Sequence, residues 1–223
     1  MSQHSEDVNE WTSISDLMAA LVTIIMLLLV ITIIANILKT KRLEEAKQKE
    51  MLDYQDSVMK RIELSINIDT NIVEFIKDGS FIRFKGDQSF KANSACVGKE
   101  LEKTLLDSSF AEEFVKIVND NWSIQIEGHS DPRRVGVKGN TLDAPFCAYF
   151  DDNYSLSAQR AKIVAETILK KIKIQDPEME EKVRKHISVV GYGPNRLKNA
   201  EEPNSSENRR IDIKFIAPGK SAN

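Results

Sequence analysis

The sequence predicts an α+β fold, a two-layer domain with helices on one face of a mixed sheet, preceded by a single transmembrane helix and a helical stalk. Three stretches support this prediction. Residues 17–38 contain no charged side chain, residues 39–63 are rich in helix-forming residues, and from residue 64 short alternating runs are interleaved with amphipathic ones. A chain of 223 residues has room for one membrane helix, a connector and one domain of ordinary size.

The uncharged run from Leu17 to Leu38 is long enough to cross a membrane. At ~1.5 Å per residue, a helix of this length covers the ~30 Å hydrocarbon core of a bilayer. The run is longer than the apolar core of a secretory signal, no basic region precedes it, and no small-residue cleavage site follows it. We therefore interpret it as an uncleaved signal anchor.

The stretch from residue 39 to residue 63 predicts a helical connector that continues the membrane helix as a stalk. Its apolar residues recur at steps of three and four or their multiples, and they are Leu43, Ala46, Tyr54, Val58 and Ile62. Fewer than four clean heptads are present, so two alternatives stay open: a solvated charged helix, or a weak contact between two chains.

The domain is predicted to run from residue 64 to residue 216. Alternation of apolar residues predicts strands at 64–68, 73–75, 81–84, 122–127, 186–193 and 209–216, with a turn at 77–80. Helical spacing predicts helices at 99–118, with a polar interruption at 107–109, at 153–173, and after Pro177.

The boundaries of the remaining parts follow from these predictions. Ser155 and Ser157 are the candidate N-caps of the helix at 153–173. Residues 1–15 form a segment before the membrane helix at 16–38, and residues 217–223 are predicted to be a disordered tail.

The composition argues against nucleic-acid binding and metal chemistry. A net charge of −3 with 29% charged residues implies no strongly basic face. The three histidines and two cysteines form neither a CxxC nor an HExxH motif, and Cys96 and Cys147 are too far apart for a zinc knuckle. No nucleophile with oxyanion donors can be placed around His129 and Asp131, so a catalytic pair there is rejected. We expect no enzyme, metal or organic cofactor.

Asp16 directly precedes the apolar run, and an acidic residue at this position requires an explanation. A carboxylate costs roughly 2.5–3.5 kcal/mol at the centre of a membrane helix, and less near an end. One explanation is a capping box, because Ser13 lies three residues before Asp16 and the acid would then meet the positive end of the helix dipole. The other explanation is ion handling. The local sequence leaves both open.

Three short motifs in the domain occur in order and in matching strand, helix and strand contexts. They are Gly128-His-Ser-Asp131, Asn153-Tyr-Ser-Leu-Ser-Ala-Gln-Arg160-Ala161 and Asn208-Arg-Arg-Ile-Asp-Ile213. Over about 140 residues, this combination resembles the OmpA-like peptidoglycan-binding domain, whose motifs read G-[HY]-T-D, N-x-x-L-S-x-x-R-A and N-R-R-[VI]-x-[IV].

The resemblance implies a ligand and the residues that hold it. Asp131 would bind the ammonium group of diaminopimelate in the peptidoglycan stem, and Arg160 would bind a carboxylate of the same residue. A zwitterion suits one fixed anion and one fixed cation, and a guanidinium can bind a carboxylate through two hydrogen bonds. Asn153 would organise the loop and the helix start, and Arg209 would line the site.

The sequence departs from the family pattern between Asp131 and Asn153. Residues 132–152 form an insertion beside the expected ligand pocket, with Arg133, Arg134, Lys138, Cys147, Tyr149, Phe150, Asp151 and Asp152 among its residues. The insertion could cover the site, enlarge it or pack on a neighbouring chain, so the ligand specificity stays open.

The run from Trp11 to Met18 resembles the opening W-x-x-x-[AS]-D-L-M of the membrane helix in B subunits of ion-driven motors, the MotB family. The resemblance implies that Asp16 binds and releases a translocated proton or sodium ion. It also implies a MotA-like or ZorA-like multi-helix membrane partner, because one helix cannot enclose an ion path. Two copies of the chain per complex, a homodimer within a hetero-oligomer, are expected.

Within this class the compact layout is closer to ZorB of the Zorya anti-phage defence systems than to flagellar MotB, which usually has a basic N-terminus and a longer connector. A flagellar-type stator subunit and a passive peptidoglycan-binding membrane tether remain the alternatives. In the passive tether, Asp16 would be only a cap.

The resemblance implies a single-pass bacterial inner-membrane protein with a cytoplasmic N-terminus and a periplasmic domain. Basic residues follow the helix and none precedes it within the first ten residues, so the positive-inside rule alone would place the domain in the cytoplasm. In the oxidising periplasm, Cys96 and Cys147 are expected to form a disulfide, whereas in the cytosol they would be two free buried thiols.

Overall fold

The computed structural model describes residues 3–65, 72–76, 81–90, 94–135 and 150–218. The chain separates into two units, Met1–Met51 and Leu52–Asn223, which we describe one at a time. Helix α1, Gln3–Ser65, contributes to both of them.

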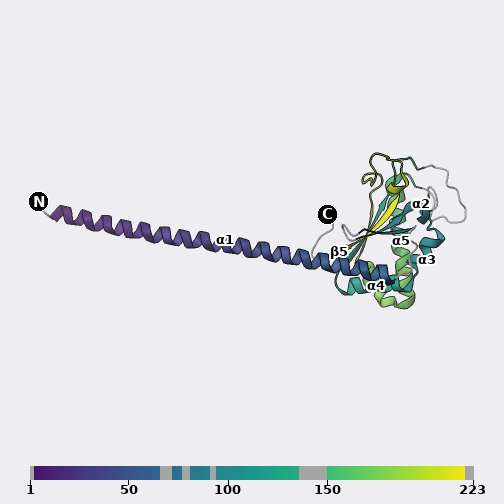
Figure 1. Ribbon diagram of the computed structural model, residues 1–223, viewed down its shortest axis with the longest axis horizontal. Helices are drawn as coiled ribbons and strands as arrows, with labels where there is room; N and C mark the ends of the chain where they lie inside the picture. Colours follow the sequence, from purple (N-terminus) through teal and green to yellow (C-terminus); the bar gives the residue numbers. More distant parts are fainter. Residues whose placement is uncertain (1–2, 66–71, 77–80, 91–93, 136–149, 219–223) are drawn as a thin grey trace. The chain divides into compact units, whose positions relative to one another are not determined.

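The first unit contains the apolar part of α1, drawn in purple and dark blue in Figure 1. Helix Ile14–Leu64 contains a stretch long and apolar enough to cross a membrane. Large apolar side chains from Ile14 to Leu38 are exposed on all sides of it. The hydroxyls of Thr23 and Thr32 donate to the carbonyls of Ala20 and Leu29, at 2.7 and 2.8 Å, so these polar side chains are satisfied within the helix itself.

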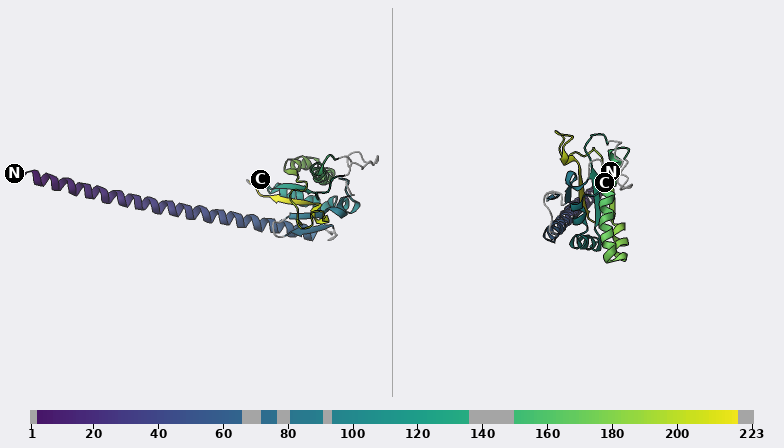
Figure 2. Two further views of the ribbon diagram at one scale, coloured as in Figure 1. Left: turned by 90° about the horizontal axis from the view of Figure 1, so that it is seen from above. Right: turned by 90° about the vertical axis from the view of Figure 1, so that its right-hand side faces the viewer.

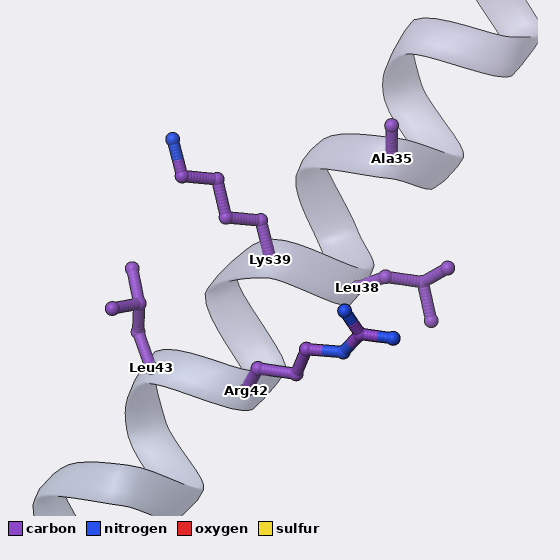
Figure 3. Close-up of a pocket in the computed structure, with 5 residues that line it drawn as sticks. All are labelled: Ala35, Leu38, Lys39, Arg42 and Leu43. Carbon is purple, nitrogen blue, oxygen red and sulfur yellow. The ribbon is translucent and has the colours of Figure 1, made fainter.

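Two basic side chains mark the end of the apolar run. Lys39 follows Leu38 directly and Arg42 comes three residues later, and Figure 3 shows both at a surface groove that Ala35, Leu38 and Leu43 also line. Long basic side chains at this position can keep their charge in water while their methylene groups cover apolar surface. The apolar surface of the first unit therefore ends at a charged boundary.

The second unit contains a five-stranded mixed sheet in the order β1-β2-β5-β3-β4. Its strands are β1 Val73–Ile76, β2 Phe81–Lys85, β3 Ser123–His129, β4 Ile187–Gly191 and β5 Arg210–Ile216. Strands β3 and β4 run parallel, and the other neighbouring pairs are antiparallel. Each strand falls within or next to a run whose alternation predicted it.

One face of the sheet is apolar and carries the helices. Its buried residues are Ile82, Phe84, Ile124, Ile126, Ile211, Ile213 and Phe215. Helix α4, Ser108–Asn119, packs here, with the ring of Phe110 6.4 Å from that of Phe84 and the ring of Phe114 6.3 Å from that of Phe215. Because residues alternate between faces along a strand, these buried apolar residues of β2, β3 and β5 lie on a single face.

Three further helices complete this layer: α3 Lys99–Leu105, α5 Asn153–Gln175 and α6 Pro177–Lys185. Figure 2 shows α5, in green, lying along the sheet that contains the yellow strand β5. Helix α5 buries Leu156, Val164, Ile168 and Ile172. The predicted fold class, a two-layer α+β domain with helices on one face of a mixed sheet, is confirmed.

The last turns of α1 belong to the domain. Val58 and Ile62 are fully buried, the ring of Tyr54 stacks on that of Trp122 at 4.3 Å, and Arg61 pairs with Glu113 at 3.0 Å. This part of the apolar stripe is therefore neither solvated nor available to a second chain. The strand predicted from Leu64 is wrong at its start, because residues 64 and 65 are helical; residues 66–68 lie outside the described residues.

The helix ends also differ in detail from the predictions. Helix α4 begins after Asp107, whose carboxylate accepts from the backbone of Ser109, within the predicted polar interruption. Helix α5 is capped by Asp152 and not by Ser155 or Ser157, because the carboxylate of Asp152 reaches the backbone N–H of Ser155 at 2.7 Å. The short helices α2 Gly86–Ser89 and η1 Ser206–Asn208 were not predicted.

Candidate functional site

Two glycines let the start of α5 lie directly against the sheet. Gly128 and Gly191 are neighbours on β3 and β4. A Cβ atom on Gly128 would lie 1.9 Å from the carbonyl oxygen of Ser157, and one on Gly191 would lie 2.6 Å from the Cβ of Ala158. Only glycine permits this approach, which brings the first turns of α5 beside the carboxyl ends of β3 and β4. The glycine and serine of the first two motifs thus have a packing role.

Asp131 follows β3 at this edge and is 5% exposed. Its carboxylate binds Arg133 through Nε at 3.0 Å and Nη2 at 2.6 Å, and it also accepts a hydrogen bond from Nη1 of Arg209. Burial raises the pKa of Asp131, but the hydrogen bonds and charges of the two arginines outweigh it, so its pKa lies below the usual value. Asp131 is therefore an ionised, doubly paired carboxylate.

Asn153, the first residue of α5, is linked to this cluster. Its side-chain amide donates to the backbone carbonyl of Arg133 at 2.8 Å. The structure thus brings Asp131, Asn153 and Arg209 together around Arg133. From the sequence alone, Arg133 was identified only as a member of the insertion. Its position two residues after Asp131, in a loop that follows a strand, was the one available signal.

Arg160 is held by a different segment. It is 4% exposed, its Nε donates to the carbonyl of Ser94 at 2.9 Å, and its guanidinium carbon lies 5.1 Å from the centre of the Phe90 ring. This buried cation is fixed by a hydrogen bond and by a cation–π contact. Its predicted role at a ligand carboxylate stays a prediction.

Cys96 lies close to the segment that holds Arg160. Its backbone N–H donates to the hydroxyl of Ser94 at 3.0 Å, and its sulfur atom is disulfide-bonded. Cys147 lies outside the described residues, so the pairing of Cys96 with Cys147 stays a prediction.

The second face of the sheet carries a buried charge network. Glu127, His129 and Asp212 offer ligand atoms within 4.8 Å of one another, with His129 Nε2 3.6 Å from each carboxylate. Both carboxylates are already paired with cations: Lys214 lies 2.8 Å from Glu127, and Arg83 and Arg210 lie 2.8 and 3.1 Å from Asp212. Because these cations occupy the carboxylate oxygens, we interpret the group as a network of paired charges and not as a metal site.

The network also fixes the protonation of its members. Burial raises the pKa of Glu127, but His129, Lys214 and Gln125 outweigh it and hold the pKa at about 2. Burial lowers the pKa of His129, whose ring stacks on that of Tyr192 at a distance of 5.3 Å. The ring of His129 lies beside the carboxylates of Glu127 and Asp212. The carboxylate of Asp131 is bound to Arg133 instead.

Asp16 lies inside α1, and its side chain is exposed. The helix begins at Gln3, so Ser13 and Asp16 are both well past its first turn. The capping-box interpretation is therefore wrong, because a cap requires unpaired N–H groups at the start of a helix.

No family model and no curated protein sequence matches this chain. Among solved structures, that of a MotB like protein from Desulfovibrio vulgaris is similar with a TM-score of 0.53 and 18% identity, covering 76% of this chain and 98% of that one. The fold is MotB-like.

Two further solved structures are similar over 66% of this chain and 87% of each of theirs. The periplasmic domain of Helicobacter pylori MotB has a TM-score of 0.41 at 22% identity. The cell wall anchor of the T6SS from Pseudomonas aeruginosa has a TM-score of 0.42 at 24% identity.

Proposed function

We propose that the chain is the peptidoglycan-anchored, stator-type subunit of an ion-driven rotary motor in a bacterial inner membrane, in layout closest to ZorB of the Zorya anti-phage defence systems. The observation that carries the proposal is the combination of two features in one chain. An acidic residue lies within a helix that is apolar enough to cross a membrane, and a MotB-like domain follows that helix. A stator requires both an ion site and an anchor.

Asp16 is the proposed ion carrier. It is exposed on a helix whose large neighbouring side chains are apolar and exposed too, namely Ile14, Leu17, Met18 and Leu21. A carboxylate in apolar surroundings is costly when charged, so its charge changes readily with its neighbours. A multi-helix partner of the MotA or ZorA type would surround α1, and protonation and deprotonation of Asp16 would then bias the interface between the two proteins.

The proposed anchor is the edge of the domain that carries Asp131 and Arg160. Each is more than nine-tenths buried, and each is fixed by defined contacts. A rigid anion and a rigid cation suit a ligand with an ammonium and a carboxylate group, which are both present in diaminopimelate. Asn153 and Arg209 hold the loops around this edge.

Substitution Asp16→Asn tests the motor directly. Asparagine has nearly the same shape and keeps a hydrogen-bond acceptor, but it cannot carry a proton. We expect complete loss of phage protection, measured as efficiency of plating, in cells that express the chain with its neighbouring genes. Asp53→Asn is the matched control, because Asp53 is an exposed residue of α1 beyond the apolar run. Protection that survives Asp16→Asn would refute an ion path through this residue.

Fusion proteins test the proposed orientation. Alkaline phosphatase is active only in the periplasm, so a fusion after residue 218 should be active, whereas the same fusion with a fluorescent protein exported through the Sec pathway should be dark. The opposite pattern would place the domain in the cytoplasm, as the basic residues after the helix would by the positive-inside rule. In that case the domain could not bind peptidoglycan, and the wall-binding part of the proposal would be wrong.

A further inference from the structure

The carboxylate of Asp131 is already occupied by groups of its own chain. Its oxygens accept three hydrogen bonds from Arg133, through the backbone N–H at 3.2 Å and through Nε and Nη2, and a fourth from Arg209. One negative charge thus faces two positive charges. Because these donors occupy both oxygens of Asp131, an ammonium group can pair with this carboxylate only if one guanidinium leaves.

The two arginines are not equivalent. The side chain of Arg133 is 56% exposed and that of Arg209 is 20% exposed, whereas that of Asp131 is only 7% exposed. Exposed ion pairs contribute little to stability, about 0–1 kcal/mol, and are therefore the easier ones to open. Arg133 also belongs to a loop, whereas Arg209 directly precedes β5. Arg133 is the guanidinium that can leave.

We propose that Arg133 is an intramolecular latch, whose guanidinium occupies the place at Asp131 that the ammonium group of a diaminopimelate-type ligand would take. The inference rests on the wall-binding function proposed above. Backbone hydrogen bonds hold Arg133 in position. Its carbonyl accepts a hydrogen bond from the side-chain amide of Asn153 at 2.8 Å, and its backbone N–H donates to Oδ1 of Asp131, the oxygen that its guanidinium does not contact. When the side chain swings out, these backbone contacts keep the loop in place, so the site opens without refolding.

The latch makes a prediction that a ligand-binding arginine would not make. If Arg133 competes with the ammonium group, its removal strengthens wall binding. If Arg133 instead contacted a ligand carboxylate, its removal would weaken binding. The sign of the change therefore separates the two roles.

The experiment measures pelleting of the full-length protein, in detergent, with purified peptidoglycan sacculi. Arg133→Ala should lower the apparent Kd about 3- to 5-fold, which corresponds to the free energy of an exposed ion pair. Arg134→Ala is the matched control, because Arg134 is the next residue, is also exposed, and makes no ion pair among the described residues. It should leave the apparent Kd unchanged. Unchanged or weaker binding by Arg133→Ala would overturn the latch.

A second readout excludes a merely structural role. Arg133→Ala should lower Tm slightly in the absence of sacculi, because Asp131 loses one partner, while it raises the affinity. A purely structural contact would lower both stability and binding. Arg133→Lys, which keeps the charge without the planar fork, should fall between wild type and Arg133→Ala in affinity.

The double variant Asp131→Ala with Arg160→Ala separates failure of the latch from failure of the proposed function. If it abolishes pelleting and Arg133→Ala changes nothing, only the latch is wrong. If the double variant pellets as well as wild type, wall binding at this edge is wrong and the latch with it. If wild type does not pellet but Arg133→Ala does, the latch is supported, and Arg133 blocks the site in the wild-type protein. If neither protein pellets, both the latch and wall binding at this edge are wrong.

Discussion

The first unit and the domain both contain carboxylates in apolar or buried surroundings. The buried carboxylates of the domain are paired with cations, whereas that of the first unit has no such partner among the described residues. In the domain, Glu127, Asp131 and Asp212 are each at most 5% exposed, and each is bound to one or two cations of the same chain. In the first unit, Asp16 makes no ion pair within the residues that the structure describes.

The two regions differ in the same way in their apolar surface. Helices α4 and α5 each bury one apolar stripe against the sheet, which is what a helix in a soluble domain does. The first unit instead exposes large apolar side chains on every side, from Ile14 to Leu38. The second unit therefore buries the apolar stripes of its helices, while the large apolar side chains of the first unit stay exposed.

Removing a paired charge should have the largest effect on stability. Asp212→Ala leaves Arg83 and Arg210 without their shared carboxylate, and their side chains are only 11% and 8% exposed. Loss of one member of a buried ion pair costs about 3–5 kcal/mol, and for a domain of this size a drop in Tm of roughly 10 °C follows. Thermal unfolding of the full chain measures the change.

Asp53→Ala is the control for this substitution, because Asp53 is exposed on α1. Exposed substitutions of this kind stay within about 0.5 kcal/mol. A small effect of Asp212→Ala, similar to that of the control, would show that the second face of the sheet is solvated and that the contrast between the two regions is false.

Acid should weaken the same network without any mutation. The pKa of Glu127 is lowered from 4.5 to about 2 on folding, so its contribution to stability is fully present above pH 4.5 and is lost as pH falls toward 2. The contribution is up to about 3 kcal/mol. Burial also lowers the pKa of His129 from 6.5, so a second loss of stability begins below pH 6.5, where the unfolded chain takes up a proton first.

Unfolding by urea between pH 2 and pH 7 measures this dependence. Glu127→Gln should make the limb between pH 4.5 and 2 less steep, because glutamine does not titrate, while the slope below pH 6.5 remains. An acid limb that is equally steep in wild type and Glu127→Gln would show that Glu127 is not the titrating group.

Periodicity predicted much of the fold because the domain has one apolar face. Alternation in β3 and β5, and helical spacing in α5, are consequences of that face, and the strands and helices were found near their predicted bounds. The exception at residues 64 and 65 has a specific cause. The chain stays helical through residue 65 because Val58 and Ile62 are buried against the domain. The local sequence does not show what such an apolar stripe will pack against.

The site was predictable only in part for a related reason. Motif spacing pointed to Asp131, Asn153, Arg160 and Arg209, but it could not show which cation binds which carboxylate. The pairing of Arg133 with Asp131 is set by loop geometry, which has no sequence period, and the cap at Asp152 is set by which of several polar residues meets the first turn of α5. Side-chain contacts of this kind require the fold first.

The last turns of α1 give the smallest effect and sharpen the boundary between the two regions. The hydroxyl of Tyr54 donates to Asp120 at 2.6 Å, while its ring stacks on Trp122. Tyr54→Phe keeps the stack and loses one hydrogen bond, so we expect about 0.5–1.5 kcal/mol of destabilisation by urea unfolding. Tyr54→Ala should cost more, because the stack is lost as well. If neither substitution changes stability, residues 52–65 belong with the exposed helix and not with the domain, and the boundary lies later in the chain.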